Sequence, residues 1–308
     1  MYKNINDKHL IYTPDQPFYI ASSTRYLKYS IKKYGLSHFY AFYSLDEVHV
    51  SNIVPDGCID ITFCCNNNSP YAYTRGTVLR ARAPKAAHFK KHNYYFGVRF
   101  LPGWRPALLK NDISMCELLE QELPFSYVVQ NSGITDNIIR SRDFFKQMQV
   151  FMSYYMPMYF SSDEQSVSCR KRLARYVRRS ILCSNESHCI QRIASEAGVS
   201  VRYINLAFNE EFGISPKLFS SLVRFQQCLI NINHGNGNSF LREIASKSGY
   251  YDQSHMTKEF LSFMDISPKQ YQVFLRDTDF SSRLIVHHND NKPNELASEF
   301  NNLLHNIS

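Results

Sequence analysis

Ile-Ala-Ser-Glu-Ala-Gly at residues 193–198 returns as Ile-Ala-Ser-Lys-Ser-Gly at residues 244–249, an offset of 51 residues. Ile-Ser-Pro-Lys at residues 214–217 is repeated without change at residues 266–269, an offset of 52 residues. The added residue of the second copy falls after the glycine, in the predicted turn. A repeat that keeps its register in this way predicts two copies of one structural unit.

Each copy has the residues of two helices joined by a tight turn. The alanine is small enough to let two helices cross closely, and the glycine supplies the positive φ that a tight turn requires. Ser200 and Asp252 follow the glycines and are good N-caps for the next helix. Phe208 and Phe260 then close onto the core. The pattern predicts two helix-turn-helix units, whose second helices enter a DNA major groove; the alternative is a purely structural helical repeat.

Positive charge is concentrated around the repeat. The 308 residues carry 35 Lys and Arg against 27 Asp and Glu, a formal net charge of +8. Residues 165–275 hold 14 basic and 8 acidic residues, whereas residues 276–308 hold 3 and 5. Six basic residues stand together without an acidic one, and we expect them either to contact phosphates or to form a solvated helix face: Arg170, Lys171, Arg172, Arg175, Arg178 and Arg179.

The first 130 residues read mostly as strands. Residues 40–45, 59–64 and 94–100 are rich in aromatic and β-branched side chains, and turn formers separate them. Many short strands with polar turns indicate a small barrel or sandwich. From about residue 134 apolar residues recur at helical spacing, which predicts a helix whose stripe is either core or a dimer contact: Ile138, Phe145, Met148, Met152, Tyr155 and Tyr159.

The predicted fold class is α+β. We expect a β-rich sensory domain with a helical extension over residues 1–160, a linker over 161–167, an all-helical domain with two helix-turn-helix units over 168–275, and a polar tail over 276–308. A linking helix over residues 217–232 would be roughly 24 Å long. Once the sideways displacement of the recognition helices is added, it could hold them about 34 Å apart, which is one DNA turn.

The second copy reads Ile-Ala-x3-Gly-Tyr-x-Asp-Gln-Ser-His-Met-Thr-Lys-Glu-Phe over residues 244–260 and closes with Ile-Ser-Pro-x-x-Tyr over 266–271. With the first copy over residues 193–216, it resembles the DNA-binding domain of the AraC/XylS family of bacterial transcription regulators. Arg224 stands where that family keeps an arginine in its linking helix. The resemblance covers residues 168–275, about a third of the chain, and implies a sequence-specific DNA-binding regulator.

The chain departs from the family pattern at three positions. Leu206 stands where the family often carries an arginine, Cys228 where an alanine is common, and Gln272 where an arginine is frequent. The N-terminal half is similar to the sensory domain of a subset of these regulators, over residues 54–63 and 97–103. That resemblance implies an effector-binding or dimerising module and names no ligand.

Outward-facing residues near the start of each recognition helix are the candidate DNA contacts. Arginine can read guanine with two hydrogen bonds and asparagine can read adenine, whereas Leu206 has only a thymine methyl group to contact. The first unit offers Ser200, Arg202, Tyr203 and Asn205, and the second offers Gln253, Ser254, His255, Thr257 and Lys258. We expect Ile204, Ala207 and Phe208 to face inward in the first unit, and Met256 and Phe260 in the second.

The sequence predicts no enzyme, cofactor or metal site. Cys64 and Cys65 are adjacent and would point to opposite faces of a strand, and His88 and His92 lie in a strand-rich region. A DNA-binding domain fused to a cysteine repair module would need zinc-ligand cysteines near the N-terminus, and none precedes Cys58. A Gly-rich phosphate loop and a G-x-S-x-G elbow are also missing from the sequence.

A few N-terminal residues have two readings. Asp56 and Asp60 form a pair of carboxylates, although in a Pro-Asp-Gly turn Asp56 is a turn former. Tyr95, Arg99 and Trp104 either line an effector cavity or belong to the core.

We therefore expect a cytoplasmic transcription regulator. Its candidate partners are double-stranded DNA, RNA polymerase, a small-molecule effector and a second copy of the chain, and we expect no membrane, because the sequence has neither a signal peptide nor a run of 18 apolar residues. One alternative is a constitutive regulator whose N-terminal domain only dimerises. An enzyme or repair module fused to a DNA-binding domain is the alternative of another class.

Overall fold

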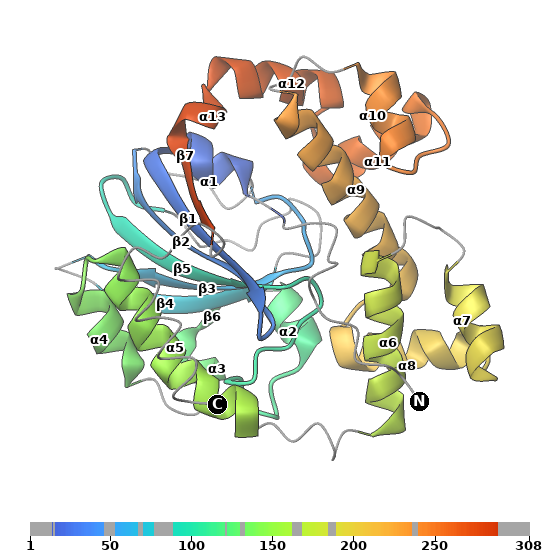
Figure 1. Cartoon of the computed structure of the whole chain (residues 1–308), viewed down its shortest axis with the longest axis horizontal. Coiled ribbons are helices and arrows are strands. Elements are labelled where there is room, and N and C mark those ends of the chain that lie inside the picture. Colours follow the sequence, from blue (N-terminus) through green and yellow to red (C-terminus); the bar gives the residue numbers. More distant parts are fainter. Residues whose placement is uncertain are drawn as a thin grey trace.

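The structure is a computed structural model that describes residues 14, 16–45, 53–66, 70–76, 89–120, 122–129, 133–161, 168–183, 189–235 and 240–288. A β-sheet with helices beside it and a separate group of helices make up these residues (Figure 1). The predicted α+β fold class is confirmed. The predicted linker falls almost wholly outside the described residues.

The N-terminal half is built on one seven-stranded sheet with the order β6-β4-β3-β5-β2-β1-β7. Two of the strands predicted from the sequence, residues 59–64 and 94–100, have the predicted bounds. The strands are β1 (Ser23–Lys33), β2 (Leu36–Ser44), β3 (Ile59–Cys64), β4 (Tyr71–Gly76), β5 (Tyr94–Phe100), β6 (Leu123–Pro124) and β7 (Leu284–His288). Neighbouring strands are antiparallel except for β1 and β7, which are parallel. Among the described strands the sheet stays open, with β6 and β7 at its edges.

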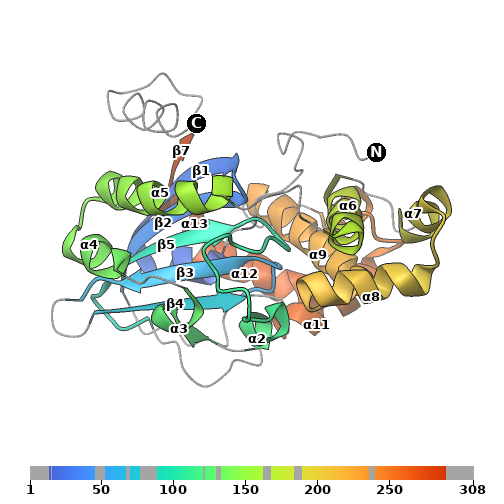
Figure 2. The ribbon, with the colours of Figure 1, turned by 90° about the horizontal axis from the view of Figure 1, so that it is seen from below.

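Helices α4 (Ile134–Arg140) and α5 (Phe144–Ser161) cover one face of the sheet (Figures 1 and 2). The ring of Phe151 on α5 packs edge-on against Phe39, with centroids 5.7 Å apart. Met148, Met152 and Tyr155 on the predicted helical stripe are buried in the same cluster. These residues of the stripe therefore pack in the core of the same chain, which favours the core alternative over a dimer contact. Among its described residues this half also has three shorter helices, α1 (Pro17–Ala21), α2 (Met115–Glu120) and α3 (Phe125–Val128).

The C-terminal domain is all-helical and contains both predicted units. It consists of α6 (Cys169–Cys183), α7 (Cys189–Ala197), α8 (Val201–Phe212), α9 (Pro216–His234), α10 (Leu241–Lys247), α11 (Gln253–Met264) and α12 (Pro268–Asp277). Gly198 and Gly249 turn between the paired helices with φ of 63° and 77°, as the sequence predicts. Helix α9 joins the units over 19 residues, about 28 Å at 1.5 Å per residue.

Residues 280–288 differ from the predicted polar tail. After the short helix α13 (Phe280–Arg283), β7 adds to the edge of β1, pairing Tyr26 with Leu284 and Lys28 with Val286. Arg283 donates to the backbone carbonyls of Ala21 and Ser23, at 2.5 and 3.0 Å. The run Leu-Ile-Val at residues 284–286 has high β propensity, and an exposed strand edge was available to pair with it. The rest of the tail, residues 289–308, lies outside the described residues.

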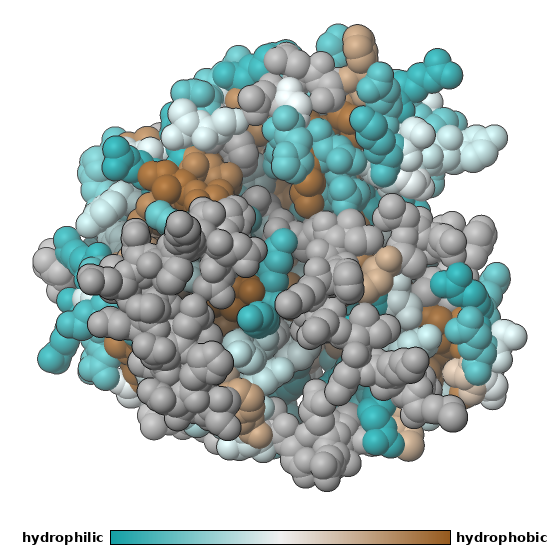
Figure 3. Space-filling model, viewed as in Figure 1, coloured by the Kyte–Doolittle hydropathy of each residue, from teal (hydrophilic) through white to brown (hydrophobic). Residues whose placement is uncertain are grey.

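The surface over this added strand is apolar. Figure 3 shows hydrophobic atoms gathered at the upper left of the view, over β7 and its neighbours. Val286 on β7 is 36% exposed. No helix among the described residues has the length and apolar character needed to cross a membrane.

Candidate nucleic-acid interface

Helix α8, the second helix of the first unit, buries one face and exposes the other. Ile204, Ala207 and Phe208 are at most 1% exposed, as predicted. Arg202 is exposed on the opposite face, and Leu206 has 49% of its surface exposed. Residues four apart lie on one face of a helix, so Arg202 and Leu206 stand side by side there.

The polar residues around these two have local roles. Ser200 is the N-cap of α8, and its hydroxyl accepts from the backbone N–H of Tyr203 at 3.1 Å. Asn205 turns back on its own helix and donates from Nδ2 to the carbonyl of Val201 at 2.9 Å, which leaves it half-buried. Asn205 therefore differs from the fully outward side chain that the sequence predicts, because a helix backbone oxygen four residues earlier is within its reach.

Helix α11 in the second unit repeats this arrangement. Met256 and Phe260 are fully buried, and Asp252 caps the helix by accepting from the backbone N–H of His255 at 2.6 Å. Thr257, which corresponds to Asn205, likewise donates to a carbonyl four residues earlier, that of Gln253, at 2.8 Å. The predicted contact residues that remain exposed are Gln253, Ser254, His255 and Lys258.

The two recognition helices present different chemistry at equivalent positions. The two N-caps, Ser200 and Asp252, are 52 residues apart. By the same offset, Leu206 in the first unit occupies the position that Lys258 occupies in the second. The outward face of α11 is therefore polar and cationic, whereas that of α8 combines one cation with an exposed aliphatic side chain. Both faces begin at a helix N-terminus whose first turn holds no acidic residue.

The second unit is braced by an ion pair that the sequence did not predict. Arg224 on α9 donates to both carboxylate oxygens of Glu259 on α11, at 3.1 and 2.7 Å. Its guanidinium also lies over the ring of Tyr250, 5.0 Å from the centroid. Burial alone would lower the pKa of Arg224, but the bond to Glu259 raises it above its usual value. Arg224 thus fixes α11 against the linking helix while α11 keeps its outer face free.

The other two departures from the family pattern are packing positions. Cys228 is fully buried in α9, where burial raises the pKa of its thiol to about 12, so it stays a neutral small side chain. Gln272 on α12 is 8% exposed. Neither residue lies on an exposed recognition face.

The basic run on α6 is less available to DNA than its sequence indicates. Arg170 pairs with Glu210 at 3.0 Å, and Arg175 pairs with Glu211 at 3.1 Å. Arg178 is only 6% exposed and donates to the carbonyl of Gly103 at 3.1 Å. The expectation of a phosphate-contacting run is therefore wrong for Arg178, because the N-terminal domain packs over that side of the helix.

The same packing joins the helical domain to the sheet. Arg178 stacks on Trp104, with the guanidinium carbon 4.9 Å from the ring centroid. Gln226 on α9 donates to the carbonyl of Pro55 at 2.6 Å, in a buried position. Gly213 after α8 approaches Cys116 on α2 so closely that a Cβ there would lie 2.9 Å from the backbone nitrogen of Cys116. The first unit and the linking helix α9 thus contact the N-terminal half.

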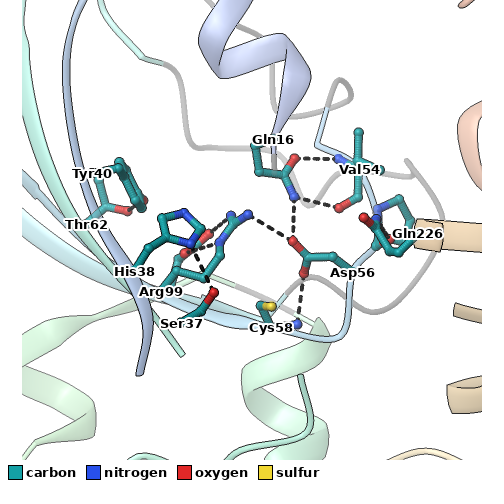
Figure 4. A network of polar contacts seen from close by, with 12 residues as sticks. Gln16, Ser37, His38, Tyr40, Val54, Asp56, Cys58, Thr62, Arg99 and Gln226 are labelled. Atoms are coloured by element: carbon teal, nitrogen blue, oxygen red, sulfur yellow. Dashed lines mark hydrogen bonds and ion pairs between the residues drawn. The ribbon is translucent and has the colours of Figure 1, made fainter. Parts of the chain in front are cut away.

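A buried ionic network lies directly behind the Pro55 contact (Figure 4). Arg99 on β5 donates to both oxygens of Asp60 on β3, and its Nη1 lies 3.0 Å from the carboxylate of Asp56. Asp56 also accepts from the backbone N–H of Cys58 at 2.8 Å, so it is the predicted turn former as well as an ion-pair partner. Gln16 then donates to Asp56 at 2.9 Å and exchanges two hydrogen bonds with the backbone of Val54.

Arg99 stays charged although it is completely buried. Burial opposes the charge, but the carboxylates of Asp60 and Asp56 raise the pKa of Arg99 well above its usual value. Tyr95 lies four residues before Arg99 on β5, so its side chain is on the same face of the sheet. It is likewise fully buried. Both side chains are therefore part of the core on this face of the sheet. Of the two alternatives for Tyr95 and Arg99, core residues or the lining of an effector cavity, their complete burial favours the first.

Strand register places the network in a polar row that crosses the sheet. Ser30 pairs with His38, His38 with Arg99, Arg99 with Asp60, and Asp60 with Arg75. His38 is fully buried, and burial, together with the nearby charges of Lys28 and Arg99, lowers its pKa well below the usual value. This row could not be predicted from the sequence, because its members come from five strands that only the register brings together.

Comparisons with known proteins support the helical half. Residues 193–273 match the family model described as a helix-turn-helix domain, which confirms the two units predicted from the repeat. No curated protein matches the chain.

Solved structures of ToxT from Vibrio cholerae are similar to the chain. One is 14% identical with a TM-score of 0.38, covering 77% of this chain and 97% of ToxT. A second, bound to (E)-4-(8-methylnaphthalen-1-yl)but-3-enoic acid, is 16% identical with a TM-score of 0.36 and the same coverage. A third, with bound unsaturated fatty acid, is 16% identical with a TM-score of 0.34, covering 81% of this chain and 93% of ToxT.

Proposed function

We propose that this chain, whose C-terminal domain is a helix-turn-helix domain of the AraC type, is a sequence-specific DNA-binding regulator of transcription controlled by a small molecule at its N-terminal sheet. The observation that carries the DNA-binding part is the pair of recognition helices, α8 and α11, each capped at its N-terminus and exposed along one face. Linked by α9, they can enter successive turns of one major groove without a second copy of the chain.

We assign base reading to the exposed residues of these helices. Arg202 in the first unit and Gln253, Ser254 and Lys258 in the second have outward side chains that can reach base edges. Tyr203 and His255 flank the faces, where each meets an aromatic or cationic neighbour within the protein. Ser200, Asn205 and Thr257, which bond to their own helix, are assigned to shaping the helix starts and to phosphate contact.

Control by an effector would use the contacts between the two halves. The polar row of the sheet reaches Asp56 through Arg99, and the neighbouring Pro55 accepts the hydrogen bond of Gln226 on the linking helix. A ligand that prefers one arrangement of the sheet face would therefore bias the position of α9, to which both recognition helices are joined. We place this regulator in the cytoplasm, with RNA polymerase and a second copy of the chain as its remaining candidate partners.

Binding of selected DNA tests the DNA-reading proposal. Duplexes enriched from a random pool by the full chain should bind it tightly, and the affinity should fall by about 10³–10⁵ between 50 and 200 mM salt if 6–10 phosphates are contacted. Lys258→Ala should weaken binding to the selected duplex about 10-fold and to random DNA much less. Lys146→Ala, which removes another exposed charge from α5, is the matched control and should bind both duplexes normally.

Equal losses on both duplexes would make Lys258 a phosphate contact. An affinity that does not change with salt would refute DNA binding by these helices.

Thermal unfolding of the full chain tests the effector part. The full chain is needed because β7, which pairs with β1 at the edge of the sheet, comes after the DNA-binding domain in the sequence. Within a panel of organic acids, amino acids and sugars, an effector at 100 times its Kd should stabilise the protein by about 2.7 kcal/mol. It should also change the affinity for the selected duplex. A constitutive regulator would show no such linkage, and an enzyme would consume the compound.

A further inference from the structure

Leu206 is an apolar side chain in a position where the fold does not need one. It is 49% exposed and lies on the face of α8 opposite the buried Ile204 and Phe208. Single exposed leucines are common on protein surfaces. This one stands one helical turn after Arg202, on the outward face of a helix whose counterpart α11 carries Lys258 at the same position.

The surroundings of Leu206 favour a polyanion as the occupant of this face. Arg202 is exposed beside it, and the N-terminus of α8 is capped by Ser200 with no acidic residue in its first turn. Arg170 on α6 also flanks the face, with its guanidinium 5.5 Å from the ring centroid of Tyr203, but its charge is paired with Glu210 of α8 at 3.0 Å. A helix start and the cation of Arg202 beside one aliphatic side chain match a phosphate-lined groove that contains an apolar group.

The major groove offers one apolar group that a leucine can contact, the C5 methyl of thymine. Leucine has no hydrogen-bonding atoms, so guanine, cytosine and adenine edges give it no favourable partner and would lose water against it. Lysine at the equivalent position of α11 selects acceptor groups instead. The two units would therefore read different kinds of base edge from the same place on the helix.

Building on the proposed function, we propose that Leu206 is a specificity-determining residue that reads the methyl group of a thymine in the half-site bound by the first unit, next to the base contacted by Arg202. The operator is then composed of two unlike half-sites. The first requires a thymine at one fixed position, and the second is read through Lys258.

Replacing thymine by uracil in the selected duplex removes only the methyl group and tests this contact. Each thymine of the duplex is changed singly, and binding is measured for the wild-type chain, Leu206→Ala and the control Lys258→Ala. We expect one substitution in the first half-site to weaken wild-type binding about 4-fold, the loss from one desolvated methyl group. Leu206→Ala should be insensitive to that substitution, and Lys258→Ala should keep the wild-type sensitivity.

Several results would overturn the proposal. Wild-type binding that tolerates uracil at every thymine would do so, as would a uracil penalty that survives in Leu206→Ala. A Leu206→Ala chain with the uracil penalty intact and a changed sedimentation coefficient would assign the face to contact with a second copy. Failure of the wild-type chain to bind any duplex would instead refute the proposed function itself.

Discussion

Removing the negative charge of Asp60 should strongly destabilise the N-terminal sheet. Arg99 is completely buried, and its partners Asp56 and Asp60 have side-chain exposures of 0% and 2%. Asp60→Asn keeps the shape of the side chain but leaves the buried guanidinium with one carboxylate in place of two. Breaking a buried ion pair from one side costs about 3–5 kcal/mol, because the remaining charge is uncompensated.

We expect the lower end of that range, since Asp56 still faces Arg99. A loss of about 3 kcal/mol corresponds to a fall in Tm of roughly 6–12 °C for a protein of this size. Circular dichroism of the full chain at pH 7, by heating and in urea, measures both quantities. Glu210→Gln is the control, because its carboxylate pairs with Arg170 while 51% exposed, and such pairs contribute at most about 1 kcal/mol.

An Asp60→Asn protein that unfolds within about 2 °C of the wild type, or that is no less stable than Glu210→Gln, would contradict this prediction. Either result would mean that water reaches the network or that Asp56 alone compensates the charge of Arg99.

Three further predictions concern the sheet and its contact with the helices. Because the pKa of His38 is lowered in the folded state, the unfolded chain binds a proton below about pH 6.5 that the folded chain does not, and stability should fall as the pH falls. In urea titrations the wild type should lose about 1.4 kcal/mol more stability than His38→Gln between pH 7.5 and 5.5, and equal losses would contradict this prediction. Gln226→Ala should cost about 1–3 kcal/mol in urea unfolding because the carbonyl of Pro55 loses its donor, while its half-buried neighbour Gln227→Ala should cost much less; similar costs would count against this contact. Ending the chain after residue 283 should lower the Tm and promote aggregation through the bared edge of β1, whereas ending it after residue 288 should not; identical behaviour of the two truncations in light scattering would speak against β7 as an edge cover.

Local signals explain most of what the sequence predicted correctly. The repeat, the turn glycines and the caps Ser200 and Asp252 act within a few residues, so their structural meaning can be read from the order of amino acids alone. The strands at residues 59–64 and 94–100 have strong β propensity of their own. For the same reason the burial of Ile204 and Met256 follows from helical spacing.

Features that depend on distant partners were not predictable in this way. Asp60 and Arg99 are 39 residues apart, and only the pairing of β3 with β5 places them together. The burial of Arg178 depends on Gly103, 75 residues away. The assignment of residues 284–286 to a tail overlooked a short β-prone run, whose role depends on an open strand edge at the other end of the sequence.

The pairing of β7 with β1 also sets a delay during synthesis of the protein. β1 ends at Lys33 and β7 ends at His288, so the ribosome must add roughly 250 residues before the sheet can be completed, which takes on the order of 10–50 s at 5–20 residues per second. During that interval the outer edge of β1 can pair with the β7 of another nascent chain. Chains made side by side on one messenger RNA would therefore be prone to exchange this strand, and spacing their synthesis in time favours the monomeric pairing.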